Sequence, residues 1–174
     1  MSGIALLVPN QQMYDQAREI LEKLDRHHVI LLKSIVTENA VNEAREAVSM
    51  GANIIMARGR QAVEIREHTT VPVSEIVISA QELGLLVVKA KALVEKECPV
   101  IGLFGWGEMF SDTSYFDQLY GVKLIRCVLK GTEDWRAVLD QVLEENSIDI
   151  VIGGKAALSA AEGRGIPALF LSST

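Results

Sequence analysis

The chain lacks the features that mark a membrane protein or a disulfide-rich secreted protein. Its first residues carry no basic segment, and no apolar run approaches the roughly twenty residues that a membrane span requires. The two cysteines, Cys98 and Cys127, show no CxxC or metal-ligand spacing, and we interpret them as small apolar fillers. These absences predict a cytoplasmic protein that folds without disulfides.

A basic excess, the usual mark of a nucleic-acid surface, is also absent. The net charge of −6 opposes attraction to phosphate backbones and to anionic lipid. We therefore expect no direct contact with nucleic acid or with a membrane. With 174 residues, 49% of them hydrophobic, the chain can bury a core as one domain or as two small lobes.

Catalytic constellations are missing as well. The predicted loops carry no nucleophile with a base, no metal-ligand set and no pair of carboxylates, so we expect no catalytic residue, no metal and no cofactor. A racemase or lyase on a two-lobed scaffold remains the alternative. Cys98 precedes a predicted strand and Cys127 lies inside one, so neither stands at the strand ends where a racemase of this type would need its thiols.

Short apolar runs rich in β-branched residues alternate with helical patterns along the whole chain, which is typical of a parallel α/β protein. Strands are predicted within residues 4–8, 29–36, 54–57 and 71–78, and again within 100–104, 122–129, 148–152 and 166–171. We predict two similar flavodoxin-like lobes, each a four-stranded parallel sheet of order βαβαβαβ. The first lobe spans residues 1–79, a connecting helix 80–97, and the second lobe 98–174.

An internal repeat supports the duplication. Five residues recur at one offset of 95 positions, Gly59, Arg60, Ala62, Glu67 and Pro72 matching Gly154, Lys155, Ala157, Glu162 and Pro167. Any two βαβ units share a glycine after a strand and a proline before one, which is the alternative explanation. If the repeat is real, Gly59 and Gly154 occupy equivalent positions. Two such sheets side by side would leave a ligand-binding cleft at the carboxyl ends of their strands.

Glycine and cationic residues gather at those strand ends. Arg58, Gly59 and Arg60 follow one predicted strand, and Gly153, Gly154 and Lys155 follow its counterpart. A helix N-terminus with glycine and a nearby cation suits a carboxylate or a phosphate. The alternative is that the glycines only ease tight turns while the three cations are solvated. We expect the cationic side chains at a solvated rim, in contact with a small anionic metabolite.

Two further residues are candidates for ligand contact. Trp106 stands in a glycine-flanked loop and forms either an aromatic wall for a ligand or the edge of a core. Its loop superficially matches a dinucleotide fingerprint, but Phe110 stands where the third glycine is required, which argues against a nicotinamide cofactor. Asn10 follows the first strand and is either a ligand contact or a helix cap.

The order of these segments resembles the N-terminal receptor domain of propionate-catabolism-type transcriptional activators. The resemblance rests on Ala57-Arg58-Gly59, Val71-Pro72-Val73, Ile78 to Leu83, Val100 to Trp106, Ile152-Gly153-Gly154 and the segment from Ala160 to Ser172. It implies a sensor of a small metabolite, such as a methylcitrate-like tricarboxylate, that precedes a nitrogen-regulator-type ATPase and a helix-turn-helix domain in a sigma-54-dependent, phosphorelay-type regulator. Gln81-Glu82 departs from the Tyr-Asp frequent in that family.

The chain holds no Walker loop and no DNA-reading region, and it stops at Thr174, where the family usually continues into another helix. We therefore expect an excised fragment or a stand-alone receptor. The leading hypothesis is a sensor whose ligand shifts the population toward a closed cleft and so alters the surface offered to the ATPase. A pure interaction domain that uses the same surfaces as homodimer contacts is a further alternative.

Overall fold

The computed structural model describes residues 3–24, 28–131 and 134–171. The chain divides into two compact units, here called lobe 1 and lobe 2. Lobe 1 consists of Met1–Val77 together with Gly107–Met109, and lobe 2 consists of Ile78–Trp106 together with Phe110–Thr174.

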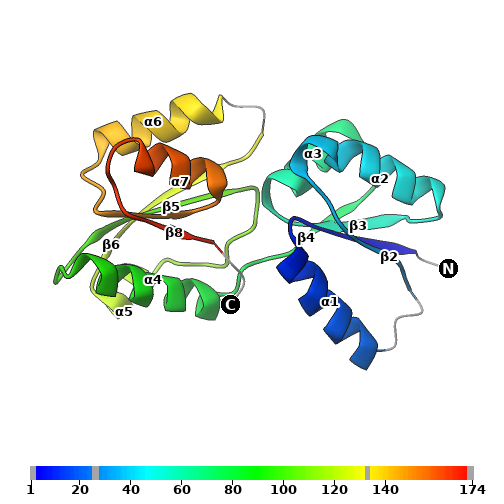
Figure 1. Cartoon of the computed structure of the whole chain (residues 1–174), viewed down its shortest axis with the longest axis horizontal. Helices are drawn as coiled ribbons and strands as arrows, with labels where there is room; N and C mark the ends of the chain where they lie inside the picture. The colour runs from blue at the N-terminus through cyan, green and yellow to red at the C-terminus, as the bar shows by residue number, and fades with distance from the viewer. Residues whose placement is uncertain (1–2, 25–27, 132–133, 172–174) are drawn as a thin grey trace. The chain divides into compact units, whose positions relative to one another are not determined.

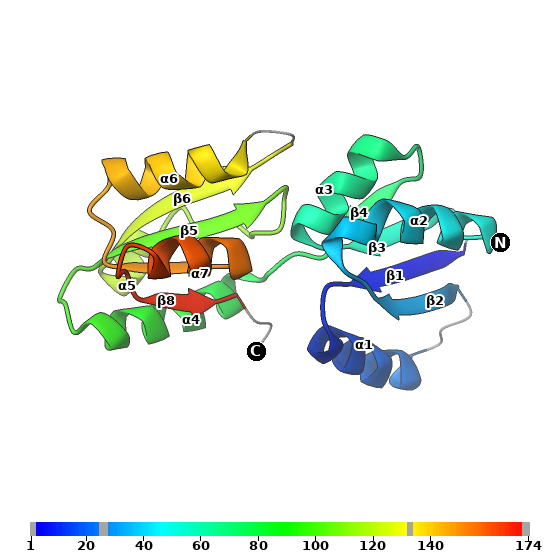
Figure 2. The same ribbon diagram turned by 45° about the horizontal axis from the view of Figure 1, so that its top comes forward.

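Lobe 1 is a doubly wound parallel sheet. Its elements are β1 (Ile4–Val8), α1 (Gln11–Lys23), β2 (Val29–Ser34), a 3-10 turn η1 (Thr37–Asn39), α2 (Ala40–Ser49), β3 (Ile54–Ala57), α3 (Gly59–His68) and β4 (Val73–Glu75). The strands pair in the order β2-β1-β3-β4, all parallel. Helices α2 and α3 cover one face of this sheet and α1 covers the other (Figure 1, Figure 2).

Lobe 2 repeats this plan and adds one helix. Its elements are α4 (Ala80–Val94), β5 (Val100–Trp106), α5 (Phe116–Tyr120), β6 (Lys123–Leu129), α6 (Trp135–Glu145), β7 (Ile150–Gly153), α7 (Lys155–Glu162) and β8 (Ala168–Phe170). The order β6-β5-β7-β8 is the order of lobe 1, so the predicted fold class of two similar four-stranded parallel lobes is confirmed.

Local sequence accounts for where several helices begin. The Asn10 side chain accepts a hydrogen bond from the backbone N–H of Met13 and caps α1. Ser79 and Glu82 form the capping box that opens α4. The Asp134 side chain accepts a hydrogen bond from the backbone N–H of Ala137 and caps α6.

The core of lobe 1 lies between its sheet and the α2–α3 layer. Ala5, Leu7, Ile55 and Ala57 alternate along β1 and β3 and point to this side, where they meet small residues of α2. On the opposite side of the same strands, Val8 is buried, whereas Ile54 and Met56 are only half-buried. One sheet face therefore forms most of this core.

In lobe 2 both faces of the sheet are fully packed. Phe104 and Val151 belong to the core under α6 and α7, whereas Ile150 and Ile152 are completely buried on the other side. Helix α4 covers this second side with a row of buried residues, Leu83, Leu86, Val87 and Ala90. On the corresponding side lobe 1 has α1, and α4 has no counterpart among the described helices of lobe 1.

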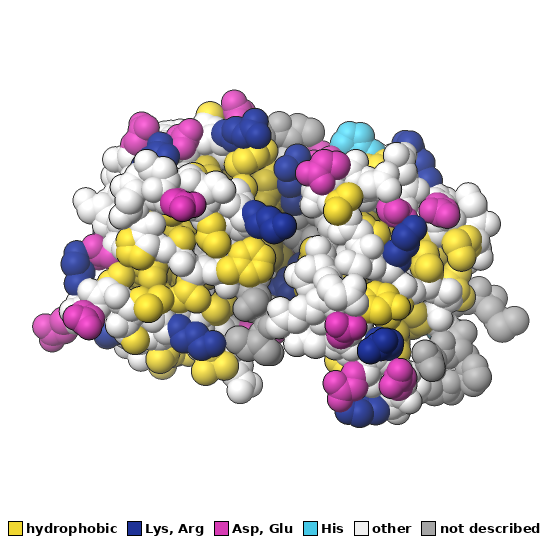
Figure 3. All heavy atoms as spheres, viewed as in Figure 1, with side chains coloured by type: hydrophobic (Ala, Val, Ile, Leu, Met, Phe, Trp, Pro, Cys, Tyr) yellow, Lys and Arg dark blue, Asp and Glu magenta, His cyan; other side chains and the backbone are white. Residues whose placement is uncertain are grey.

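Among the described helices, none is long and apolar enough to cross a membrane. On the face shown in Figure 3, acidic and basic side chains are interspersed over both lobes, and the side chains drawn there form no continuous basic surface. This agrees with the net charge of −6, which disfavours binding to a nucleic-acid backbone.

Candidate functional site

The strand order creates a switch point at the carboxyl edge of each sheet. In lobe 1, β1 and β3 are neighbours, but the chain leaves them toward opposite edges and opposite faces, through α1 and α3. Open α/β sheets bind ligands at such a point, because the two departing connections leave a crevice there. The structure brings Asn10, after β1, and Arg58, after β3, to this place.

Arg58 is the central residue of the lobe 1 switch point. Its side chain was expected at a solvated rim, but the residue is buried, with only 8% of its surface exposed. Its guanidinium Nη1 lies 3.3 Å from the Sδ atom of Met13 in the first turn of α1, which is why the side chain is covered. The site therefore holds a buried positive charge.

The first turn of α3 stands directly after Arg58. Arg58 is the N-cap residue, and no side chain caps this helix. Gly59 begins α3 with a φ of +58°, a conformation that side chains with a Cβ rarely adopt. The N–H groups of a first helical turn carry partial positive charge and favour an anion. Arg60 follows, half-buried, with its Nε 3.2 Å from the carboxylate of Glu64.

Gln61 is a residue of this site that the sequence did not reveal. It is 2% exposed and lies in the same first turn of α3, where its Nε2 donates to the carbonyl oxygen of Ile35, at 2.9 Å. Its Oε1 is buried and has no hydrogen-bond partner among the described residues. Its signal in the sequence is a polar residue beside Ala62, Val63 and Ile65, all of them buried. An unsatisfied buried oxygen is the kind of group that a ligand hydroxyl would satisfy.

Asn10 has a structural task in lobe 1. Its Oδ1 accepts from the Met13 N–H at 2.8 Å, so the capping alternative accounts for it. The loop after β5 in lobe 2 also has a local structural task, since the hydroxyl and the backbone N–H of Ser114 donate to Asp112 and hold the pKa of that carboxyl below its usual range.

The switch point of lobe 2 lies between β5 and β7 and has a different chemistry. Gly153 ends β7 and is buried, Gly154 is the exposed N-cap residue of α7, and Lys155 is exposed. No side chain caps α7, and a Cβ on Gly154 would meet no atom within 4 Å. Trp106 is the last residue of β5 and is half-buried. This edge is open, with a solvated cation in place of a buried one.

The predicted equivalence of Gly59 and Gly154 is wrong by one residue. Arg58 and Gly154 are both N-cap residues, and Gly59 and Lys155 are both first helical residues, an offset of 96. The offset of 95 applies only later, where Pro72 and Pro167 accept equivalent hydrogen bonds from Ile55 and Val151. The one-residue change of offset falls between the helix starts and these prolines, where the helices also differ in length, α3 having 10 residues and α7 having 8. The buried cation is thus specific to lobe 1.

Groups with catalytic potential are not brought together in the part of the chain that the structure describes. Cys98 is exposed and precedes β5, whereas Cys127 is buried inside β6. The ring of His68 contacts the carbonyl oxygen of Glu64 at the end of α3. Residues 3–24, 28–131 and 134–171 contain no group of three or more His, Cys, Asp or Glu that could hold a metal ion.

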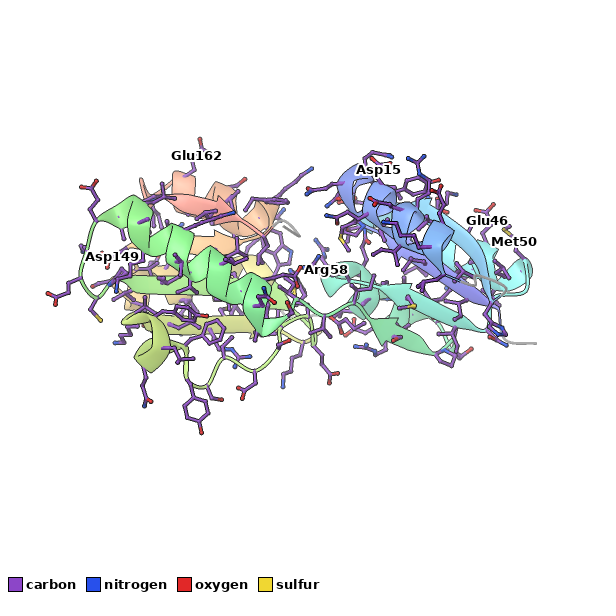
Figure 4. The ribbon with its side chains drawn as sticks, turned by 90° about the horizontal axis from the view of Figure 1, so that it is seen from below. Asp15, Glu46, Met50, Arg58, Asp149 and Glu162 are labelled. Carbon is purple, nitrogen blue, oxygen red and sulfur yellow. The ribbon has the colours of Figure 1, made fainter. Side chains whose placement is uncertain are left out.

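A hollow of about 530 Å³ lies at the other end of lobe 1, before β3 and β4. Its polar lining includes Arg45, which donates to the carbonyl oxygen of His68, and Thr69, which donates to that of Ile65. Both contacts satisfy carbonyl groups at the C-terminus of α3. We interpret this hollow as a capping region, and Figure 4 shows Arg58 at the opposite end of lobe 1 from Glu46 and Met50 of the α2 end.

Comparison with known proteins agrees with this fold. The sequence profile described as "Propionate catabolism activator" matches residues 14–174. The chain belongs to this family. A regulatory, sensing role fits a member of the propionate catabolism activator family.

A solved structure with a TM-score of 0.72 shows the same fold. An NtrC family transcriptional regulator from Clostridium acetobutylicum superposes with a TM-score of 0.72 at 19% identity, covering 99% of this chain and 88% of that chain. The ABC domain in complex with L-Trp from Streptococcus pneumonia gives a TM-score of 0.46 at 12% identity, covering 99% of this chain and 74% of that chain. A XylFII-LytSN complex gives a TM-score of 0.46 at 13% identity, covering 100% of this chain and 81% of that chain. No curated protein sequence matches the chain.

Proposed function

We propose that this propionate catabolism activator family member is a ligand-sensing domain that binds a small carboxylate at the lobe 1 switch point. The observation that carries the proposal is Arg58, a buried cation at the start of an uncapped helix. A guanidinium group can present two parallel N–H donors, which match the two oxygens of a carboxylate. The first-turn N–H groups of α3 add donors to the same anion.

The ligand class follows from the groups at this edge. Arg58 and the α3 first turn favour one carboxylate, and the unpartnered Oε1 of Gln61 favours a donor such as a hydroxyl group. A hydroxycarboxylate satisfies both requirements. The exposed Lys155 at the switch point of lobe 2 is a separate and weaker candidate contact for a carboxylate.

The regulatory step in this proposal is a population shift. A ligand that binds one arrangement of the protein better than another changes the proportion of the two, and its differential affinity sets the size of the effect. The surface changed in this way is proposed to control an ATPase domain in a longer sigma-54-dependent activator. A homodimer through the same domain is compatible with this scheme.

Calorimetric titration with citrate, succinate and acetate tests the proposal on the parent, Arg58→Met, Lys155→Ala and the control Arg45→Ala. Arg58→Met retains most of the side-chain volume and should lower carboxylate affinity by about 10- to 100-fold, since a charge-assisted hydrogen bond contributes roughly 1.5–3 kcal/mol. Lys155→Ala should lower it by less, about threefold. Arg45→Ala, at the other end of lobe 1, should leave it unchanged.

Circular dichroism and urea unfolding of each variant separate lost binding from lost folding. Equal affinity of parent and Arg58→Met, or no binding of any of the three acids to the parent, would contradict the proposal. Slow chemical conversion of a bound acid would instead favour the enzyme alternative.

A further inference from the structure

The short segment Gly107–Met109 follows β5 of lobe 2 in the sequence but packs in lobe 1. The backbone N–H of Glu108 donates to Oε2 of Glu75, the last residue of β4, at 3.1 Å. The Gly107–Met109 segment and Glu75 therefore lie in the same lobe, and the Glu75 carboxylate anchors the segment to β4.

Glu75 is an unusual residue for the end of an edge strand, because its side chain is only 4% exposed. Its Oε2 also lies 3.4 Å from Nη2 of Arg66, while Oε1 is buried and has no hydrogen-bond partner among the described residues. Burying a carboxylate with one unsatisfied oxygen is unfavourable. This oxygen lies on the side of Gly107 where another residue would carry its Cβ.

Gly107 is shaped to receive the carboxylate. Its φ is +57°, in the left-handed region, and a Cβ built on it would lie 2.7 Å from Oε1 and 2.8 Å from Oε2 of Glu75. Any other residue would displace the carboxylate. The carboxylate and the glycine thus fit together only as a pair, and this fixes the direction in which the chain continues to Met109.

Met109 lies against the first turn of α3. It is 8% exposed, and a Cβ built on Gly59 would lie 3.4 Å from its Sδ and 3.7 Å from its Cε. Gly59 is the first residue of α3, directly after Arg58. The anchored segment therefore places a flexible thioether beside the N-terminus that the proposed function assigns to the ligand.

We propose that Glu75 is a positioning residue that holds Gly107–Met109 as a strap on the α3 N-terminus, and that Met109 limits the size of the carboxylate accepted there. This rests on the proposed function for the ligand, whereas the strap itself is a property of the ligand-free protein. A small acid fits beside Met109, and a larger one requires the thioether to move. Strap position and ligand occupancy are then coupled.

Amide hydrogen exchange of the ligand-free protein tests the anchor, with Glu75→Ala, Glu75→Gln and the matched control Glu46→Gln. Glu75→Ala should raise the exchange rate of the Glu108 amide about tenfold, the effect of losing one hydrogen bond. The amides of Gly59 to Gln61 should also exchange faster, while those of β1 and β3 stay unchanged. Glu75→Gln keeps an acceptor oxygen and should restore most of the Glu108 protection.

A purely structural role for Glu75 predicts something else. Exchange would then rise throughout lobe 1 in step with the lost free energy of unfolding, and Glu75→Gln would give no selective rescue. That result, or an unchanged exchange rate of the Glu108 amide in Glu75→Ala, would contradict the role of Glu75 as an anchor.

Titration of Met109→Ala with acetate and citrate tests the size limit. The affinity for citrate relative to acetate should rise about three- to tenfold, because the shorter alanine side chain leaves more space for the larger acid. An unchanged ratio overturns the role of Met109. If neither acid binds the parent, the proposed function fails, and the exchange experiment still decides whether Glu75 anchors the strap.

Discussion

The two lobes have the same connectivity and strand order, yet their carboxyl edges differ in chemistry. Lobe 1 carries a buried Arg58, a buried Gln61 and the Gly107–Met109 segment at its switch point, and lobe 2 has two glycines and an exposed Lys155 at the corresponding place. The fold repeats, and so does the position of the switch point. The buried cation lies in lobe 1 and the exposed one in lobe 2, so the same topology carries different side chains at its switch points, and our proposal assigns the carboxylate to lobe 1 for this reason.

The first prediction exchanges a residue between the lobes and has the largest expected effect. Gly153 of lobe 2 stands where lobe 1 has Ala57, and a Cβ on Gly153 would lie 2.5 Å from the Cβ of Ala157. Gly153→Ala should lower the free energy of unfolding by about 2 kcal/mol, since overpacking of a tight core typically costs 1–3 kcal/mol. Urea unfolding measures this.

The reverse exchange is its control. Ala57→Gly in lobe 1 removes a buried methyl group and should cost about 1 kcal/mol. A neutral Gly153→Ala would mean that α7 can move away from β7 without loss, and that the two lobes tolerate the same residues.

A smaller effect is expected at the amino ends of the sheets, where Asn53 precedes β3 and Asp149 precedes β7. The Asp149 carboxylate accepts hydrogen bonds from Lys96 and from the backbone N–H of Val100, which hold its pKa below the usual range. Figure 4 shows Asp149 at the end of lobe 2. Asp149→Asn, which introduces the lobe 1 residue, should cost about 1 kcal/mol at neutral pH.

The contribution of the Asp149 carboxylate to the free energy of unfolding depends on pH. Because the folded-state pKa is depressed, the stabilisation is present above the unfolded value of about 4 and is lost as the pH falls through the folded value. The difference in unfolding free energy between parent and Asp149→Asn should therefore shrink from pH 6 toward about pH 3. Asp15→Asn on α1 is the control, and a difference that stays constant with pH would contradict the assignment.

Much of the fold could be predicted from the sequence, for local reasons. The alternation of β-branched runs with helical patterns predicts the strands of both sheets. Asn10 caps α1, which is one of the two roles expected for it, and the Ser79–Glu82 capping box opens α4. These signals act within a few residues of one another, so one sequence contains them completely.

The chemistry of the site was less accessible because it depends on distant contacts. Arg58 looked solvated after a strand, but Met13, 45 residues away, covers it. Glu75 and Glu108 meet across 33 residues, and no local pattern pairs them. The one-residue error between Gly59 and Gly154 arose because a shared glycine was aligned where the helix starts differ.

The measurement that tests the central claim most directly is the change in backbone amide chemical shifts when citrate, succinate or acetate is added to the parent protein. If lobe 1 recognises the carboxylate, the amides of Gly59, Arg60 and Gln61 should shift most, with smaller changes at Lys155, and Arg58→Met should abolish the shifts in α3. Shifts confined to lobe 2, or none in the first turn of α3 at saturating ligand, would contradict the account.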